Sequence, residues 1–195
     1  MAKLYFIYAA MNAGKSALLL QSAYNYRERG MQVMLWTSSH HGEQDGDLAD
    51  ISSRIGLTAP AHVYRAETDI AGAIAARLND GPLDAVFVDE AQFLSSEQVW
   101  QLSAAVDELN VPVMCYGLRT DFQGRLFPGS AELLAIADQL REMKTICHCG
   151  RKATMTARID DAGRALTEGA QVEIEKSHYV ALCREHWKTA TKHQD

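Results

Sequence analysis

The feature that most constrains what this chain can fold into is one short stretch, Ala9-Ala10-Met11-Asn12-Ala13-Gly14-Lys15-Ser16. An apolar run at residues 4–8 precedes it, and a helical pattern that ends near Gly30 follows it. A strand, a short loop, Gly-Lys-Ser and a helix, in this order, form a phosphate-binding loop. Ala9 stands where the pattern G-x-x-x-x-G-K-[ST] has its first Gly, and Ala is compatible with the loop if its φ stays negative.

The chemistry of such a loop depends on this order of residues. Loop amides and the N-terminus of the following helix point at the anion, Lys15 reaches the outer phosphates, and the Ser16 hydroxyl can hold Mg²⁺. We therefore predict that residues 9–16 bind the phosphates of a nucleotide. The alternative is an ordinary strand-to-helix turn in which Lys15 is solvated.

Length and composition are those of an ordinary globular protein, with 195 residues, 47% apolar and 23% charged. The formal net charge of -6 argues against a broad surface for nucleic acid or anionic membranes. No apolar run is long enough to span a bilayer, and no secretory signal is visible. We expect a cytoplasmic protein with neither a nucleic-acid nor a membrane partner.

Strand-like and helix-like segments alternate along residues 31–141. Strands are expected at residues 31–37, 61–65, 85–88 and 111–116. Helices are expected at residues 69–78, after a capping box of Ser95 and Gln98, and at residues 130–141 with Leu140 facing inward. Residues 40–50 and 118–128 are expected to be loops. The alternation predicts an α/β fold, a parallel sheet of the P-loop NTPase type flanked by helices.

The pattern changes near residue 143, where segments become short and turn signals are frequent. We expect a small β-rich lobe there, closing with a helix at residues 184–192. The predicted division is a nucleotide-binding domain at residues 1–142 and this lobe at residues 143–195.

Two acidic residues, Asp89 and Glu90, follow the buried strand at residues 85–88. In phosphate-loop proteins an Asp at the carboxyl end of a neighbouring strand completes the Mg²⁺ site, and Asp89 fits that role. Glu90 beside it can act as the base on the group that attacks the γ-phosphate. The alternative is a pair of solvated carboxylates at a strand end.

The loop at residues 117–127 also follows a core strand, so it is expected at the same edge of the sheet as the phosphate loop. It offers two cations, Arg119 and Arg125, and two aromatic side chains, Phe122 and Phe127. Arg can stabilise phosphoryl charge and aromatic rings can stack on a base. The alternative is that the aromatic residues only contact the core.

The four cysteines favour a metal site over disulfides. Cys147 and Cys149 form one pair of soft ligands, and Cys183 and His186 form another, which suggests a structural Zn²⁺ site of three Cys and one His. His148 and His178 are further candidates as ligands. The alternative is buried free thiols and a surface His, and Cys115, within a strand, is expected in the core.

Together these features make the sequence resemble the thymidine kinase family of the bacterial and vertebrate-cytosolic type, and most closely its enterobacterial form. The resemblance covers residues 4–187. It rests on the phosphate loop and on longer matching stretches, which are residues 24–26, 52–57, 89–94, 115–122, 144–153 and 183–186.

The resemblance implies a kinase that uses ATP as phosphoryl donor and thymidine or deoxyuridine as acceptor, for DNA synthesis by nucleotide salvage. It further implies Mg²⁺, a structural Zn²⁺, a homotetramer, and feedback inhibition by thymidine triphosphate. It assigns residues 9–16 to the donor phosphates, Asp89 to Mg²⁺, and Glu90 to the base for the nucleoside 5′-hydroxyl.

The resemblance also implies a pocket for the thymine base, lined by Met11, Phe93, Leu118, Phe122, Phe127 and Tyr179. Tyr179 would belong to a lid that the zinc lobe holds over the base and that excludes water. Family members usually carry Gly-Gly before this Tyr, whereas residues 175–178 occupy the position here.

Two other readings of the sequence remain open. Asp-Glu-Ala-Gln is also a helicase motif, but the chain is short for two motor lobes and its net charge is unsuited to a nucleic-acid track. A zinc and nucleotide binder without catalysis is the second alternative, and the presence of Glu90 beside Asp89 argues against it.

Overall fold

The centre of the molecule is a seven-stranded sheet with the strand order β3-β4-β2-β5-β6-β1-β7. The structure, a computed structural model, describes residues 1–40, 46–171 and 178–191. All neighbouring strands of this sheet are parallel except β3, which runs antiparallel to β4 at one edge. The strands are β1 Leu4–Ala9, β2 Val33–Ser38, β3 Leu48–Ser52, β4 Thr58–Tyr64, β5 Ala85–Val88, β6 Val113–Leu118 and β7 Gln139–Glu142. The predicted α/β sheet is confirmed.

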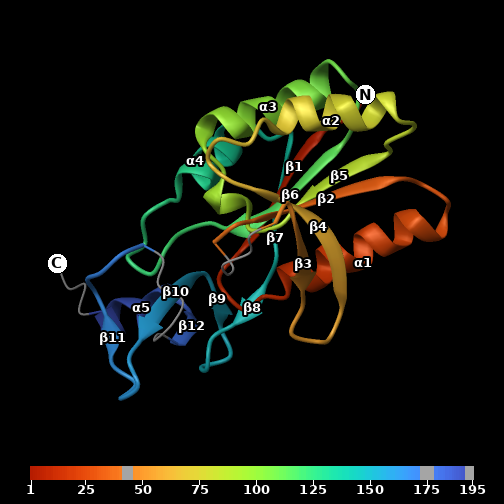
Figure 1. The fold of residues 1–195 in the computed structure, drawn as a ribbon. Helices are drawn as coiled ribbons and strands as arrows, with labels where there is room; N and C mark the ends of the chain where they lie inside the picture. The colour runs from red at the N-terminus through yellow and green to blue at the C-terminus, as the bar shows by residue number, and fades with distance from the viewer. Residues whose placement is uncertain (41–45, 172–177, 192–195) are drawn as a thin grey trace.

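Helices cover both faces of the sheet, as Figure 1 shows. On one face, α1 (Lys15–Glu28) contributes Leu19 and Leu20 to a core with strand residues. On the other face, a larger core joins the sheet to α2 (Ile70–Asn79), α3 (Ser96–Asp107) and α4 (Pro128–Ile136). The fully buried β5 explains why residues 85–88 form an uninterrupted apolar run.

Local capping signals set the starts of two helices. Ser95 and Gln98 form the predicted capping box, in which each side chain accepts a hydrogen bond from the other residue's backbone amide. Asp69 caps α2 by accepting from the amide of Gly72. Both caps satisfy amides that a helix leaves without an internal partner.

The predicted helix at residues 130–141 is wrong in its second half. The helix α4 ends at Ile136, Ala137 is extended, and residues 139–142 form β7 parallel to β1. Leu140, expected to face inward, is 49% exposed. The Asp138 carboxylate accepts a hydrogen bond from the Leu4 amide, so a contact far away in sequence ends the helical pattern and adds an edge strand.

The predicted loop at residues 40–50 contains the beginning of a strand. Residues 41–45 lie outside the described part, but β3 starts at Leu48 and pairs with β4. Only Ile51 of β3 is buried, so this edge strand lacks the apolar run by which the inner strands are recognised.

The described residues after β7 form two small sheets and one helix, at the lower left of Figure 1. One sheet pairs β8 (Thr145–Ile146) with β9 (Lys152–Ala153), and the other places β10 (Met155–Ile159) between β11 (Ala165–Leu166) and β12 (His178–Leu182). The helix α5 (Arg184–Thr191) follows and buries Trp187 in a separate small core. The closing helix was predicted, and its last predicted residue, Lys192, lies outside the described part.

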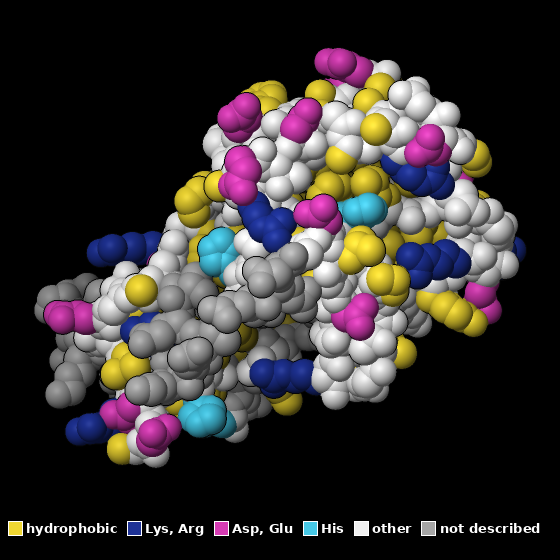
Figure 2. All heavy atoms as spheres, in the orientation of Figure 1, with side chains coloured by type: hydrophobic (Ala, Val, Ile, Leu, Met, Phe, Trp, Pro, Cys, Tyr) yellow, Lys and Arg dark blue, Asp and Glu magenta, His cyan; other side chains and the backbone are white. Residues whose placement is uncertain are grey.

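Charged side chains are mixed on the surface of the molecule. On the face in Figure 2, the described Lys and Arg side chains lie scattered among Asp and Glu and form no continuous basic band. None of the described helices combines the length and apolar character that crossing a membrane requires.

Candidate active site

The residues at 9–16 form a tight loop between β1 and α1. Ala9 is the last residue of β1, pairs with Leu118 of β6, and is not among the described residues with positive φ, so the missing glycine leaves the backbone path unchanged. Gly14 has φ 82°, a left-handed conformation that glycine adopts without strain, and it immediately precedes α1. The helix N-terminus therefore opens onto the loop, as an anion site requires.

A cavity of about 350 Å³ lies against this loop. It brings together the predicted donor and acceptor sides of the site, since Lys15 and Ser16 share it with Glu90 and Leu118. Its lining residues are Met11, Asn12, Ala13, Gly14, Lys15, Ser16, Ala17, Ser52, Arg54, Ile55, Glu90 and Leu118. Arg54, which the sequence analysis did not assign to the site, adds a second cation from the turn between β3 and β4.

Burial and charge set the electrostatics of the cavity. Lys15 is 8% exposed, and burial lowers the pKa of its ammonium group although Glu90 and Asp89 raise it. Burial, and then the neighbouring Glu90 carboxylate, raise the pKa of Asp89 to about 6, against hydrogen bonds that include one from Ser16. A buried cation and two nearby carboxylates are thus held in a space that a phosphate and a metal ion would neutralise.

The donor set beside the phosphate loop fits a magnesium ion. Ser16 acts on the Asp89 carboxyl by lowering its pKa through side-chain hydrogen bonding, so the two predicted Mg²⁺ ligands are neighbours. The Asp89 Oδ1 atom is buried and has no hydrogen-bond partner among the described residues. An oxygen left in this state is costly unless a cation or water satisfies it, and hard oxygen donors are the ligands that Mg²⁺ prefers.

Glu90 is held in an unusual backbone conformation at the end of β5. It has φ 53° and ψ 35°, a left-handed conformation that is rare for a non-glycine residue. Its backbone carbonyl accepts a hydrogen bond from the Tyr64 hydroxyl, and its carboxylate accepts one from the Gln92 side chain. Backbone strain of this kind, held by surrounding contacts, is concentrated at functional sites.

Gln92 is a site residue that the sequence analysis missed. It lies in the short 3-10 helix η1 (Ala91–Phe93), is 1% exposed, and its amide oxygen also accepts a hydrogen bond from the Leu118 amide at 3.0 Å. It therefore ties Glu90 to the end of β6. The motif Asp-Glu-Ala-Gln contained this signal, because a glutamine two residues after a predicted base is within reach of it.

The aromatic residues predicted for the base pocket fall into two groups. The Phe93 and Phe127 rings meet edge to face with centroids 5.7 Å apart, and His40 stacks on Phe93. Phe122 is 1% exposed, and the Arg158 guanidinium lies 4.1 Å above its ring.

The structure joins only part of the predicted base pocket to the cavity. Met11 and Leu118 line the cavity, whereas Phe93, Phe122, Phe127 and Tyr179 are not among its described lining residues. Tyr179 lies half-buried in β12. The predicted lid residues 175–177 lie outside the described part of the chain.

The four predicted zinc ligands form one cluster. The ligand atoms of Cys147, Cys149, Cys183 and His186 all lie within 4.8 Å of one another. His186 Nδ1 is 3.4 Å from the Sγ atoms of both Cys147 and Cys183. Three thiols and one imidazole at this separation fit a tetrahedral Zn²⁺ site. Cys115 is buried within β6, where a core residue was expected.

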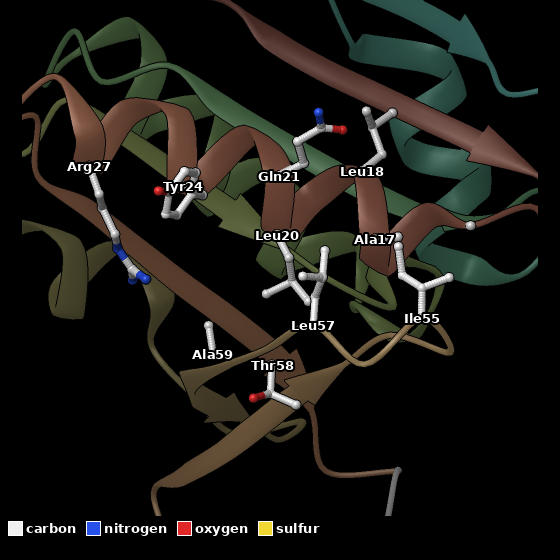
Figure 3. A pocket seen from close by; sticks show the side chains of 11 residues that line it. Ala17, Leu18, Leu20, Gln21, Tyr24, Arg27, Ile55, Leu57, Thr58 and Ala59 are labelled. Atoms are coloured by element: carbon white, nitrogen blue, oxygen red, sulfur yellow. The ribbon is translucent and has the colours of Figure 1, made fainter.

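A second, more apolar pocket of about 680 Å³ adjoins the phosphate loop, and Figure 3 shows its side chains. Residues of α1 form one wall, and residues of the turn after β3 and of the start of β4 form the other. The lining residues are Gly14, Ala17, Leu18, Leu20, Gln21, Tyr24, Arg27, Ile55, Leu57, Thr58 and Ala59. Sequence reasoning missed this pocket because its two walls are far apart in the chain.

Comparison with known proteins gives a consistent result. The family model described as thymidine kinase matches residues 2–187. A thymidine kinase of Ruegeria pomeroyi is 59% identical over 192 residues, covering 98% of this chain and 96% of the relative. A thymidine kinase of Mesorhizobium japonicum is 57% identical, covering 96% and 92%, and one of Yersinia pseudotuberculosis is 53% identical, covering 98% and 97%.

Proposed function

The chain belongs to the thymidine kinase family. From that premise we propose that the enzyme uses this cavity to transfer the γ-phosphate of ATP to the 5′-hydroxyl of thymidine or deoxyuridine. The resemblance inferred from the sequence is confirmed, and the protein is an ATP-dependent kinase that phosphorylates thymidine in nucleotide salvage. One observation carries the residue assignments: a single cavity joins Lys15 and Ser16 to Glu90.

We assign the donor phosphates to residues 9–16. The loop amides and the N-terminus of α1 bind the phosphate oxygens, and Lys15 stabilises the negative charge of the outer phosphates. The burial that lowers the pKa of Lys15 also reduces screening by water, so its charge acts strongly on a phosphate that enters the cavity. Arg54 lines the same cavity from the turn between β3 and β4 and offers a second positive charge to the anion.

We assign Mg²⁺ to Ser16 and Asp89. Bound there, the ion supplies charge neutralisation at the phosphates. The effect of Ser16 on the pKa of the Asp89 carboxyl and the unpartnered Oδ1 atom of Asp89 support this assignment.

We assign the proton transfer to Glu90. The 5′-hydroxyl is a poor nucleophile until its proton has an acceptor, and a carboxylate that faces the phosphate loop can accept it. Gln92 holds that carboxylate by a hydrogen bond and is itself fixed by the Leu118 amide, so we infer that it orients the base. In this mechanism Glu90 takes the proton while the chain positions the hydroxyl near the γ-phosphate.

For the two nucleobases, we assign thymine to the part of the cavity near Leu118 and adenine to the apolar pocket beside α1. Met11, Phe93, Leu118, Phe122, Phe127 and Tyr179 are proposed to surround thymine, with Met11 and Leu118 nearest the reacting groups. The larger pocket shares Gly14, Ala17 and Ile55 with the phosphate cavity, and its apolar walls suit a flat heterocycle.

The zinc lobe and the assembly complete the proposal. We assign Zn²⁺ to the Cys147, Cys149, Cys183 and His186 cluster, and we divide the chain into a nucleotide-binding domain at residues 1–142 and a zinc-binding lobe at residues 143–195. The end of the large sheet at β7 supports that boundary. From family membership we further propose a cytoplasmic homotetramer that thymidine triphosphate inhibits.

The proposal is tested by measuring ATP consumption with thymidine, with DNA or RNA, and with neither, on the wild type and on Glu90→Gln. Only thymidine should support turnover by the wild type. Glu90→Gln keeps the size and hydrogen-bonding reach of the side chain but removes its basicity, so kcat should fall by about 10²–10⁴. A loose transition state, in which the proton leaves late, would place the loss at the low end of this range.

Glu67→Gln, the same change at an exposed position, is the matched control and should leave kcat unchanged. ATP affinity should survive in Glu90→Gln because Lys15, Ser16 and Asp89 are untouched. An unchanged kcat would remove Glu90 from the mechanism, and turnover that required nucleic acid would overturn the proposed function.

A further inference from the structure

Two long-range hydrogen bonds join the phosphate loop to the C-terminal three-stranded sheet. The Met11 amide donates to the Thr156 hydroxyl at 3.1 Å, and the Asn12 side-chain amide donates to the Tyr179 carbonyl, also at 3.1 Å. Thr156 lies on β10 and Tyr179 on β12, which are paired antiparallel strands. The loop proposed to bind the donor is therefore held by the sheet that carries Tyr179.

Asn12 is suited to this contact by its backbone. Its φ of 63° is left-handed, which most residues adopt only with strain and which Asn tolerates better than they do. The residue is exposed, so its side chain adds little to the core. The hydrogen bond to Tyr179 is thus the main contribution that this side chain makes in the described structure.

The acceptor of this hydrogen bond is itself fixed by the proposed thymine site. Tyr179 pairs with Arg158 of β10, and the Arg158 guanidinium lies over the Phe122 ring. The same guanidinium donates to the carbonyls of Glu168 and Ala170. Phe122, Arg158 and Tyr179 thus form a chain of contacts that runs from the proposed thymine site to the Asn12 side chain.

We propose that Asn12 is a positioning residue that couples the two substrates: thymidine, by ordering β12, orders the phosphate loop through Asn12, and ATP does the reverse. The inference rests on the proposed function, because it takes ATP phosphates and thymidine as the two ligands. Coupling of binding is reciprocal, so each ligand raises the affinity for the other by the same factor. Asn12 lines the cavity as part of the phosphate loop, and the proposed coupling acts through the backbone that its side chain positions.

The experiment measures this coupling by calorimetry. The affinity for the non-hydrolysable β,γ-imido analogue of ATP, with Mg²⁺, is determined with and without saturating thymidine. Thymidine should tighten analogue binding to the wild type by about fivefold or more. Asn12→Gly keeps access to the left-handed backbone but removes the donor, and it should reduce the coupling by about three- to tenfold, the value of one neutral hydrogen bond.

Two further variants separate coupling from general damage to the fold. Asn110→Gly is a matched control, since Asn110 also has a left-handed backbone, with φ 54°. Asn110 precedes β6, at the end of the sheet away from the phosphate loop, and its side chain accepts a hydrogen bond from the Ala2 amide. It should retain wild-type coupling. Asn12→Asp keeps the shape of the side chain but presents an oxygen to the Tyr179 carbonyl, so it should lose the coupling as Asn12→Gly does.

Wild-type coupling in Asn12→Gly, or equal losses in Asn12→Gly and Asn110→Gly, would overturn the inference. Thymidine turnover is measured on the same preparations to separate the two proposals. A wild type that phosphorylates thymidine but shows no coupling overturns this inference alone. A wild type that does not phosphorylate thymidine overturns the proposed function and the inference with it.

Discussion

Asp89 illustrates how a single residue can be held in a state that weakens the fold. Its carboxyl is buried beside Glu90, and burial is the largest cause that raises its pKa to about 6. The folded protein therefore retains a proton over a pH range in which the unfolded chain, with an ordinary Asp, has lost it. The bound proton therefore adds to the free energy of unfolding. This contribution is fully present below about pH 4 and is lost as the pH rises through about 6.

Asp89→Asn removes this dependence, because an amide does not ionise. Without nucleotide or magnesium, the variant should gain stability relative to the wild type, by about 1–3 kcal/mol, between about pH 4 and about pH 8. The measurement is urea unfolding of both proteins at the two pH values. A stability difference that stays constant with pH would contradict the raised pKa, whatever the variant does to activity.

Sequence predicts single residues well where their partners are close in the chain. The geometry of a strand, a loop and a helix places Lys15 and Ser16, and the end of a buried strand places Asp89 and Glu90. Arg158 could not be predicted in this way. Its environment consists of Phe122 and of carbonyls that reach it through the tertiary fold, and nothing in its local sequence distinguishes it from a surface arginine.

At the scale of elements, the loop at residues 119–127 is also held by contacts that are distant in sequence. Its backbone is held from the C-terminal side, where the indole N–H of Trp187 donates to the carbonyls of Phe122 and Thr156, each at 3.1 Å. Arg119 also donates to the Thr154 carbonyl at 3.0 Å. The α5 helix thus joins the proposed base-binding loop to β10.

Trp187→Phe leaves these two buried carbonyls without the indole donor. It should destabilise the protein by about 1–3 kcal/mol and raise the KM for thymidine more than the KM for ATP. Trp100→Phe is the matched control, since Trp100 is 54% exposed and its indole donates to Glu132 at the surface. Its effect on stability should stay within about 0.5 kcal/mol. Equal losses in the two variants, measured by denaturant unfolding and steady-state kinetics, would exclude the proposed role of Trp187.

Helices and strands could be predicted where a run of buried residues or a capping motif is visible in the local sequence. The buried β5 and the capped α3 are such cases. The edge strands β3 and β7 were missed because an edge strand is stabilised by its neighbour's backbone, which leaves only a weak side-chain pattern. The pocket between α1 and the turn after β3 was missed for the related reason that only the fold creates it.

On the scale of the whole molecule, the cysteine cluster anchors the sheet that supports the active site. Cys183 follows β12 directly, and Cys147 and Cys149 lie between β8 and β9. Only the last residues of β12 separate the proposed zinc ligand Cys183 from Tyr179, the hydrogen-bond partner of Asn12. Loss of the metal is expected to loosen β12 and, with it, the phosphate loop.

The purified protein should contain about one Zn²⁺ per chain. Removing it with a chelator, or changing Cys183→Ser, should lower the melting temperature by about 4–8 °C and weaken binding of the ATP analogue. His178→Ala is the control, because His178 is an exposed residue of β12 and does not belong to the cluster. Elemental analysis that finds no zinc in protein never exposed to a chelator would overturn the assignment.

The hydrogen bonds of Met11 and Asn12 span 145 and 167 residues of sequence. The loop leaves the ribosome early in translation, whereas Thr156 and Tyr179 follow only after the strands and helices of the large sheet. A nascent chain can thus form β1, α1 and most of their core while the loop between them still lacks its outer supports. The proposed binding of a triphosphate is therefore expected to be acquired late in synthesis, and chains whose translation stops before residue 156 are expected to fold in part without acquiring it.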